Sequence, residues 1–490
     1  MEEKQAVVVV VINKKMKKYL FVFALLVAFC ANAQEKDTTA TFKKRVLDAT
    51  EVDFLISYYK QDGIHSAVSG GMGSEKLTDL ASNIVVSMPL NDDDILTVDA
   101  GISAYTSASS SNINPFNSSG ASGGGDDDKV ENENGPYGTP WLASSGASAQ
   151  DALTSITANY SHSSDDRNFI WSADVSFSNE YDYTSIGFGG GIAKLFNEKN
   201  TELSLKANVY LDQWRPIYPT ELYEYSKYGS AFLNNGYFSG VTVYNQAGEM
   251  SDGYLPSKFE TWQSVNRNSY SLSFAFSQIL TKKSQVSLFF DVLQQEGMLS
   301  TPYHRIYFAD KENYYIGKNQ FIPVYETPEN TGVYRLADDI ERLPGNRFKL
   351  PVGLRLNYYV NETFKIRTYY RYYFDDWGVT SHTANIEIPI KLNDKFSVFP
   401  MYRFYTQTAS KYFAPFETHT STEKYYTSDY DLSQFSSNQY GVGASYVDIF
   451  TKAHIWKFGL KNIDFRYNHY SRSDTLEADI ASMAFKFIFQ

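Results

Sequence analysis

Residues 347–374 read RFKLPVGLRLNYYVNETFKIRTYYRYYF, and the alternation within them is the clearest fold signal in the chain. Apolar or aromatic side chains occupy nearly every second position of the two arms: Phe348, Leu350, Val352, Leu354, Leu356, Tyr358 and Val360, then Phe364, Ile366, Tyr370, Tyr372 and Phe374. Charged or polar side chains stand between most of them. A period of two predicts strands with one apolar and one polar face. The segment 361–363 is a short polar turn, so the stretch predicts a β-hairpin.

Each arm has the length, roughly ten residues, that lets a tilted strand cross a bilayer. Strands in lipid must close into a barrel, because an open edge leaves backbone groups unpaired there. The same alternation recurs along the chain and predicts about 16 antiparallel strands, an even number as in single-chain bacterial barrels. The predicted strands are 46–60, 80–89, 95–107, 152–162, 168–178, 183–196, 201–212, 268–280, 285–293, 347–360, 363–374, 379–392, 395–406, 437–447, 461–470 and 476–489.

The joins between these strands are of two kinds. Short polar turns mostly alternate with long, polar, Tyr-rich segments near 106–151, 213–267, 294–346 and 407–436. This asymmetry is typical of barrels with short periplasmic turns and long extracellular loops. The strands of a soluble β-sandwich average about 5–6 residues, and its turns show no such asymmetry. The fold class predicted is therefore all-β, an antiparallel transmembrane β-barrel.

Composition agrees with this fold class and excludes others. The 490 residues have an ordinary hydrophobic content of 43% and a mean hydropathy of −0.37, as expected where the lumen and loops are polar. The 39 Tyr and 34 Phe fit aromatic girdles at the two membrane interfaces. A net charge of −12 argues against a nucleic-acid partner. The only cysteine, Cys30, lies in the N-terminal apolar segment, so a mature chain lacking that segment has no disulfide.

The N-terminus has the organisation of a secretory signal. A charged pair, an apolar run and a small-residue cleavage site follow one another: Lys17 and Lys18, then 19–29, then Ala31–Ala33. Residues 1–15 do not fit such a signal, so we expect Met16 to be the true start. The predicted domains are a signal peptide over 1–33, a periplasmic segment over 34–45 and the barrel over 46–490.

The last strand carries Met483, Phe485, Phe487 and Phe489 at alternate positions. It is similar to the aromatic-rich final strand that the barrel insertion machinery reads. The partners expected from the chain are therefore this machinery and the outer-membrane lipids.

A patch of basic residues is predicted on the water-facing side of the barrel wall, within a span of four consecutive strands of which three contribute: Lys349, Arg355, Lys365, Arg367, Arg371 and Arg403. Such a wall favours anions in an open channel. It could equally pair with loop carboxylates that fold inward and plug the lumen, namely Asp338, Asp339, Asp429 and Asp431. The acidic chain and the long loops favour the pairing.

The predicted loops hold candidate ligands for a partner or a metal: His65, His304, His419, Asp429 and Asp431. Histidine and carboxylate side chains joining two loops can hold a divalent ion, although no pair has ligand spacing. The loop carboxylates of 123–128 (GGGDDD) could bind calcium but match no EF-hand spacing. We otherwise expect no cofactor.

Catalysis has little support in the sequence. His162, His382 and His469 are predicted on the outward face near strand ends, where a lipid hydrolase would need a His and a Ser. Interfacial histidines are the simpler interpretation. The chain has no G-x-S-x-G, P-loop or C-x-x-C motif, and we expect it not to be an enzyme.

Several segments resemble an uncharacterised outer-membrane β-barrel family of Gram-negative bacteria, a domain of unknown function. They are EVDFLISYYKQDGIHSAVSGGMGSEKLTD (51–79), EYDYTS (180–185), STPYHRIYF (300–308), ERLPGNRFKLPVGLRLNYY (341–359), RTYYRYYFDDWGVTSHT (367–383) and YTSDYDLSQF (426–435). The resemblance implies a barrel anchored in the outer membrane. It also implies a small lipoprotein, in a redox system, as a candidate partner. The loop motifs 57–79 and 426–435 are where a function is expected.

Two functional hypotheses follow. The first is a pore, or a platform for partner-assisted transport, across the outer membrane, with the basic residues shaping selectivity. The second is a non-conducting barrel whose loops plug the lumen and bind a partner or a metal.

Overall fold

A computed structural model describes residues 45–106, 151–180, 182–251, 253–256, 259–262, 265–326 and 332–490. The predicted signal peptide, most of the predicted periplasmic segment and the candidate calcium residues of 123–128 lie outside these ranges.

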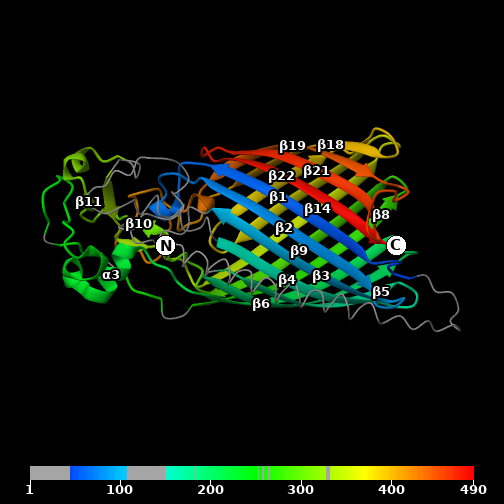
Figure 1. The fold of residues 1–490 in the computed structure, drawn as a ribbon, viewed down its shortest axis with the longest axis horizontal. Coiled ribbons are helices and arrows are strands. Elements are labelled where there is room, and N and C mark those ends of the chain that lie inside the picture. Colours follow the sequence, from blue (N-terminus) through cyan, green and yellow to red (C-terminus); the bar gives the residue numbers. More distant parts are fainter. Residues whose placement is uncertain are drawn as a thin grey trace.

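The described residues form a closed antiparallel barrel of 16 strands, which confirms the predicted fold class and count (Figure 1). Each strand pairs with the next along the chain, and the last strand closes the barrel on the first, from Glu51 opposite Ile488 to Asp62 opposite Glu477. The strands are β1 (Glu51–Asp62), β2 (Leu77–Pro89), β3 (Asp94–Thr106), β4 (Asp151–Ser163), β5 (Phe169–Asn179), β6 (Tyr183–Phe196), β7 (Thr201–Trp214), β8 (Asn266–Thr281), β9 (Ser284–Gly297), β14 (Asn346–Tyr359), β15 (Lys365–Asp375), β16 (Thr380–Glu387) continued by β17 (Ile390–Lys391), β18 (Phe396–Gln407), β19 (Phe435–Val447), β21 (Phe458–Arg472) and β22 (Glu477–Phe489).

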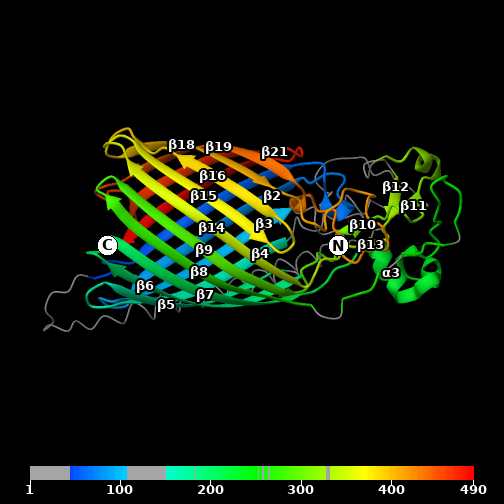
Figure 2. The ribbon, with the colours of Figure 1, turned by 180° about the vertical axis from the view of Figure 1, so that it is seen from behind.

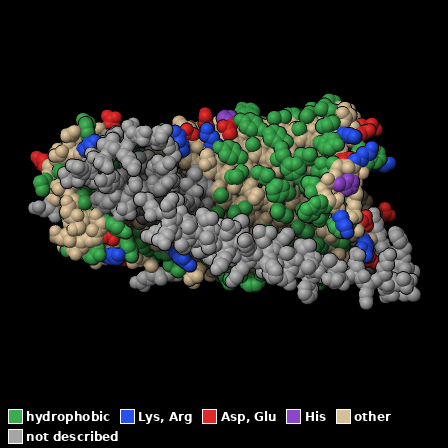
Figure 3. Space-filling view, in the orientation of Figure 1, with side chains coloured by type: hydrophobic (Ala, Val, Ile, Leu, Met, Phe, Trp, Pro, Cys, Tyr) green, Lys and Arg blue, Asp and Glu red, His purple; other side chains and the backbone are tan. Residues whose placement is uncertain are grey.

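The apolar face of each strand points outward, as the alternation predicts. In β14, the side chains of Val352, Leu354 and Leu356 are 39–42% exposed. Figure 3 shows such side chains as a hydrophobic band on the visible face of the barrel, with charged side chains gathered at the two ends of that band. A lipid-facing surface has this appearance. Among the described residues, no helix has the length and apolarity to cross a membrane.

Three of the short turns are built by the same device. Asn91, Asn361 and Asn393 each accept hydrogen bonds on the side-chain oxygen from the backbone N–H groups two and three residues later, at 2.8–2.9 Å. Asparagine favours turns because it can mimic the backbone in this way. The sequence positions of these asparagines therefore fix where three hairpins reverse.

The described parts of the loops at the other end of the barrel fold into a separate layer, here called the cap (Figure 1). Figures 1 and 2 both show its described elements beyond the ends of the strands, not inside the barrel. The cap contains η1 (Ala67–Ser69), α3 (Thr220–Tyr228), η3 (Gly229–Asn234), η4 (Gly236–Phe238), β10 (Arg305–Ile306), β11 (Tyr314–Gly317), η5 (Asn319–Val324), β12 (Val333–Leu336), β13 (Asp339–Ile340) and η6 (Tyr430–Leu432).

The largest apolar core among the described residues lies in this cap. It joins two of the long loops through buried residues that include Leu222, Phe238, Tyr254, Ile316 and Ile340. The alternation of the strands gave no indication of this core, and the sequence analysis missed α3 and the short cap strands.

Most predicted strand bounds lie within three residues of those in the structure, but β1 begins at Glu51 and not at residue 46, and β9 extends to Gly297 and not only to residue 293. The strand predicted over 379–392 is broken between β16 and β17 at Pro389, which has no N–H to donate to a ladder. β21 is longer than predicted, and β20 (His454–Ile455) forms a small hairpin with the start of β21 in the connection 448–457, the longest connection at the turn end of the barrel among the described residues.

Candidate functional site

The six predicted basic residues lie on the inner side of β14, β15 and β18, since their neighbours along each strand point outward. Cross-strand pairing sets Arg371 opposite Gly353 and Arg403 opposite Asn385. Arg466 on β21 extends the same surface but was not among the predicted basic residues, because β19, which has no Lys or Arg, separates its strand from β18. These seven residues, Lys349, Arg355, Lys365, Arg367, Arg371, Arg403 and Arg466, are called the basic wall.

Two arginines of the basic wall lie over aromatic rings of the lumen. The Arg355 guanidinium lies 5.3 Å from the Phe289 ring centroid and 5.5 Å from that of Tyr369. The guanidinium of Arg466 lies 4.7 Å from the Phe399 ring centroid. Such stacking favours a fixed guanidinium plane. It therefore holds the charges at defined places on the wall.

Two glycines make room for these rings. A Cβ on Gly353 would lie 2.0 Å from Phe289, and a Cβ on Gly443 would lie 1.8 Å from Phe399. Glycine in a strand often marks the close approach of another group. Gly353 and Gly443 therefore let the rings of neighbouring strands lie across the wall beneath the arginines.

Glu387 is the carboxylate in the middle of the basic wall. Arg367 donates to its Oε1 at 2.8 Å, and Arg466 donates to its Oε2 at 3.1 Å. The Arg367 side chain is nevertheless 54% exposed and that of Arg466 42%. The two guanidinium groups therefore share one partner and still face the lumen.

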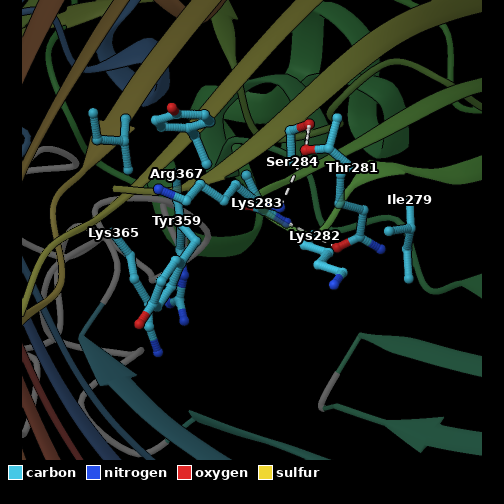
Figure 4. A pocket seen from close by; sticks show the side chains of 12 residues that line it. Ile279, Thr281, Lys282, Lys283, Ser284, Tyr359, Lys365 and Arg367 are labelled. Carbon is cyan, nitrogen blue, oxygen red and sulfur yellow. Dashed lines mark hydrogen bonds between the residues drawn. The ribbon is translucent and has the colours of Figure 1, made fainter. Parts of the chain in front are cut away.

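The basic wall reaches a hollow at the turn end of the barrel, with a volume of about 330 Å³. Lys365 and Arg367 line it together with Lys282 and Lys283 from the β8–β9 turn (Figure 4). Lys283 is tied to the neighbouring turn by a 3.5 Å hydrogen bond from Nζ to the Val360 carbonyl. Lys365 and Arg367 were predicted as lumen residues from the alternation of their strand. Lys282 and Lys283 were not predicted, because they lie in a turn, outside the alternating strands.

Carboxylates line the wall on the other side of the barrel. Asp79, Asp99, Asp174, Glu202 and Asp212 stand at inward positions of β2, β3, β5 and β7, which lie four to eight strands away from β15 around the barrel. One of them, Asp174, is paired with Lys206 at 3.1 Å. The lumen therefore has a side rich in carboxylates as well as the basic wall.

The expected pairing of the basic residues with loop carboxylates is wrong. Asp338 accepts a hydrogen bond from the Phe308 N–H, Asp339 pairs with Arg342, and Asp431 pairs with Arg472. These carboxylates thus find partners within the cap or at the rim, because the described loop residues fold on one another beyond the ends of the strands (Figures 1 and 2).

Three of the five loop residues predicted as ligands for a partner or a metal already contact other residues of the protein. The His65 ring stacks on Tyr430 with centroids 3.7 Å apart, which brings the motifs 57–79 and 426–435 together. His419 is bonded at both ring nitrogens, to Glu423 at 2.7 Å and to the Thr427 carbonyl at 2.9 Å. Asp431 is held by Arg472. These three residues have structural partners.

The other two loop candidates meet. His304 and Asp429, 125 residues apart in the chain, lie beside Glu341, and the ligand atoms of all three are within 4.8 Å of one another. Glu341 was missed, since nothing in its local sequence distinguishes it from other acidic residues. Only the cap fold brings the three together.

The three outward histidines bond to neighbours on the barrel surface. His162 contacts Asp94 at 2.6 Å, His382 contacts the Tyr370 hydroxyl at 2.7 Å, and His469 contacts Asp479 at 3.0 Å. In the described part of the chain, no serine hydroxyl is hydrogen-bonded to any of these rings. A Ser-His pair, which a lipid hydrolase needs, is not formed there.

The sequence matches one known protein family over almost its whole length. Residues 20–483 match the family described as "Protein of unknown function (DUF3570)". The chain belongs to this family. The predicted resemblance to an uncharacterised outer-membrane β-barrel family is thereby confirmed. No curated protein matches the sequence.

Solved structures are similar only in outline. A bacterial polysaccharide outer membrane secretin is 9% identical with a TM-score of 0.41, covering 91% of this chain and 100% of its own. A Pseudomonas aeruginosa FadL homologue is 8% identical with a TM-score of 0.36, covering 91% of each chain. A BenF-like porin from Pseudomonas fluorescens Pf-5 is 7% identical with a TM-score of 0.35, covering 90% of this chain and 100% of its own.

Proposed function

We propose that this barrel is a channel in the outer membrane of a Gram-negative bacterium and that it favours small anionic solutes. The observation that carries the proposal is the basic wall, whose arginines face the lumen while aromatic rings fix their positions. A barrel of this strand number encloses an aqueous lumen. Rings of Lys and Arg select for anions in such pores.

The chemistry of the wall suits carboxylate or phosphate groups. A guanidinium presents paired donors that match the two oxygens of these groups. The cationic hollow at Lys282 and Lys283 continues the surface to the turn end, which is periplasmic in barrels of this class. An anion that leaves Arg367 therefore meets further positive charge before it reaches the periplasm.

The test is conduction by the purified full-length barrel in planar bilayers. We expect ohmic conductance with a reversal potential that shows anion preference in a salt gradient. Arg367→Glu with Arg371→Glu should shift that potential toward cations. Lys311→Glu with Lys424→Glu makes the same charge change on the exposed cap surface and is the matched control. An electrically silent barrel, or equal shifts in both double variants, would contradict the proposal.

A second candidate is a non-conducting barrel whose cap binds a surface or lipoprotein partner. The observation that favours it is the folded cap, which exposes Tyr237, Met250 and Leu255 by 52%, 79% and 63% above its own core. Met250→Ser with Leu255→Ser should then abolish co-purification of the partner while the barrel still inserts. Recovery of the same proteins by wild type and variant would exclude this candidate.

A further inference from the structure

Three metal-ligand side chains from two different loops meet inside the cap. His304 and Glu341 flank the short strands β10 and β13, whose pairing sets the two residues side by side, and the Glu341 N–H donates to the His304 carbonyl at 2.9 Å. Asp429 comes from the loop after β18. The ligand atoms of the three groups lie within 4.8 Å of one another.

The His304 ring nitrogen Nδ1 is buried and has no hydrogen-bond partner in the structure. It lies 3.5 Å from Glu341 Oε2. Two ligands bound to one tetrahedral metal at about 2.0–2.1 Å stand roughly 3.3 Å apart. The separation of these two atoms is therefore close to that of two ligands of one ion, and a buried nitrogen without a partner is otherwise costly.

Glu341 is held in place by the residues around it. The Thr301 N–H donates to its Oε1 at 2.7 Å, and the Thr427 hydroxyl donates to its Oε2 at 2.5 Å. The Glu341 side chain is only 3% exposed. Outer partners of this kind orient the carboxylates of metal sites. They leave the second lone pair of Oε2 available on the side of His304.

Asp429 adds a second carboxylate to the same space. Its N–H is bonded to the Thr427 hydroxyl at 3.0 Å, so one threonine positions both acids. Two carboxylates thus lie beside one imidazole, a set of donors that a divalent cation can join.

We propose that His304, Glu341 and Asp429 bind one divalent transition-metal ion, with Zn²⁺ or Mn²⁺ as the ions that suit one imidazole and two carboxylates. The ion ties the loop between β9 and β14 to the loop between β18 and β19. The role proposed for the ion is structural, since it cross-links two loops of the cap, and this proposal does not depend on conduction through the barrel.

The test uses the full-length barrel, folded in detergent and stripped of metal with a chelator. Titration with Mn²⁺, followed by electron paramagnetic resonance, should show one ion bound per chain, and Zn²⁺ should displace it. Bound metal should also slow tryptic cleavage within the cap. Absence of saturable Mn²⁺ and Zn²⁺ binding by wild type would overturn the proposal. Equal competition by Ca²⁺ or Mg²⁺ would overturn the assignment to a transition metal.

Variants locate the site. Glu341→Gln and Asp429→Asn keep the side-chain shapes and should each weaken Mn²⁺ binding at least about tenfold. His454→Gln removes an exposed histidine of the periplasmic turn and is the control for adventitious binding. The heat-dependent electrophoretic mobility of each variant reports whether its barrel has folded. Wild-type affinity in both folded acid variants would show that the metal binds elsewhere.

Discussion

Arg367 and Glu387, on the adjacent strands β15 and β16, form an ion pair inside the barrel with Nη1 and Oε1 2.8 Å apart. The carboxylate is 11% exposed while the guanidinium remains 54% exposed. The pair is therefore unequal, because the acid is sequestered against the wall and the base remains open to solutes. Glu387 also accepts from Arg466, so one acid orients two lumen cations.

Glu387→Gln should increase the anion preference of the channel. The substitution removes the one negative charge that Arg367 and Arg466 share, while the amide oxygen can still accept a hydrogen bond. The reversal potential in a salt gradient should move further toward the anion value, most clearly at low ionic strength, where screening is weak. Glu202→Gln, which changes the same charge at an inward position of β7, five strands from β16, is the control. A shift toward cations in Glu387→Gln would contradict the role assigned to this residue.

Arg305→Met should destabilise the cap without unfolding the barrel. Arg305 and Glu221 pair through two hydrogen bonds of 2.7 and 3.2 Å, and each side chain is 1% exposed. Removing one partner of such a buried pair typically costs about 3–5 kcal/mol, because the other charge is left unpaired. Cleavage of the cap by trypsin should therefore accelerate, whereas the electrophoretic mobility of the folded barrel should not change.

The double variant Arg305→Met with Glu221→Leu is the internal check on that explanation. It removes both charges, so the cap should recover much of the protection lost in the single variant. Cleavage of the double variant at least as fast as that of Arg305→Met would show that lost packing, and not the unpaired carboxylate, is responsible.

The stabilising contribution of the Asp338 carboxyl to the cap should decrease as pH rises from about 4 to about 7. Burial raises the pKa of this carboxyl to about 7, above its ordinary value near 4. Between these values the folded cap binds a proton that the unfolded cap does not, so folding is favoured at the acidic end and the advantage is lost as pH rises through 7. Hydrogen exchange of cap amides, measured across this range, should show a weaker pH dependence in Asp338→Asn. An unchanged pH dependence in that variant would assign the effect to other groups.

The barrel was predictable because its strands and turns are determined by residues that are close together in the sequence. Each strand alternates with a period of two, and each hairpin turn is marked by residues such as Asn361 that bond their own backbone. That the side chains of Arg355 and Arg367 face the lumen follows from the two-residue period of their strands alone. Pro389 interrupts a strand for a reason that is equally visible in the sequence.

The cap was not predictable in the same way, because its contacts join residues far apart in the chain. Leu222 and Ile340 share a core, and Glu221 pairs with Arg305, without any periodic signal that connects them. His304 and Asp429 were correct candidates by residue type, but Glu341 completes their cluster only through the β10–β13 pairing. The hollow that contains Lys282 depends likewise on two turns meeting at the rim.

Lys282→Glu with Lys283→Glu should weaken anion conduction at the periplasmic end of the channel. These lysines line the hollow that also contains Lys365 and Arg367, so reversal of their charge places a repulsive group beside the path from the basic wall. The effect should be large at 0.1 M salt, where charges act over about 10 Å, and small at 1 M, where they act over about 3 Å. It should also make the current differ between the two signs of applied voltage, since only one mouth is altered. Lys199→Glu with Lys395→Glu places the same charge on other turns of that end and should have the smaller effect. Equal loss of conductance in both double variants, or a loss that persists undiminished at 1 M salt, would exclude the hollow as part of the anion path.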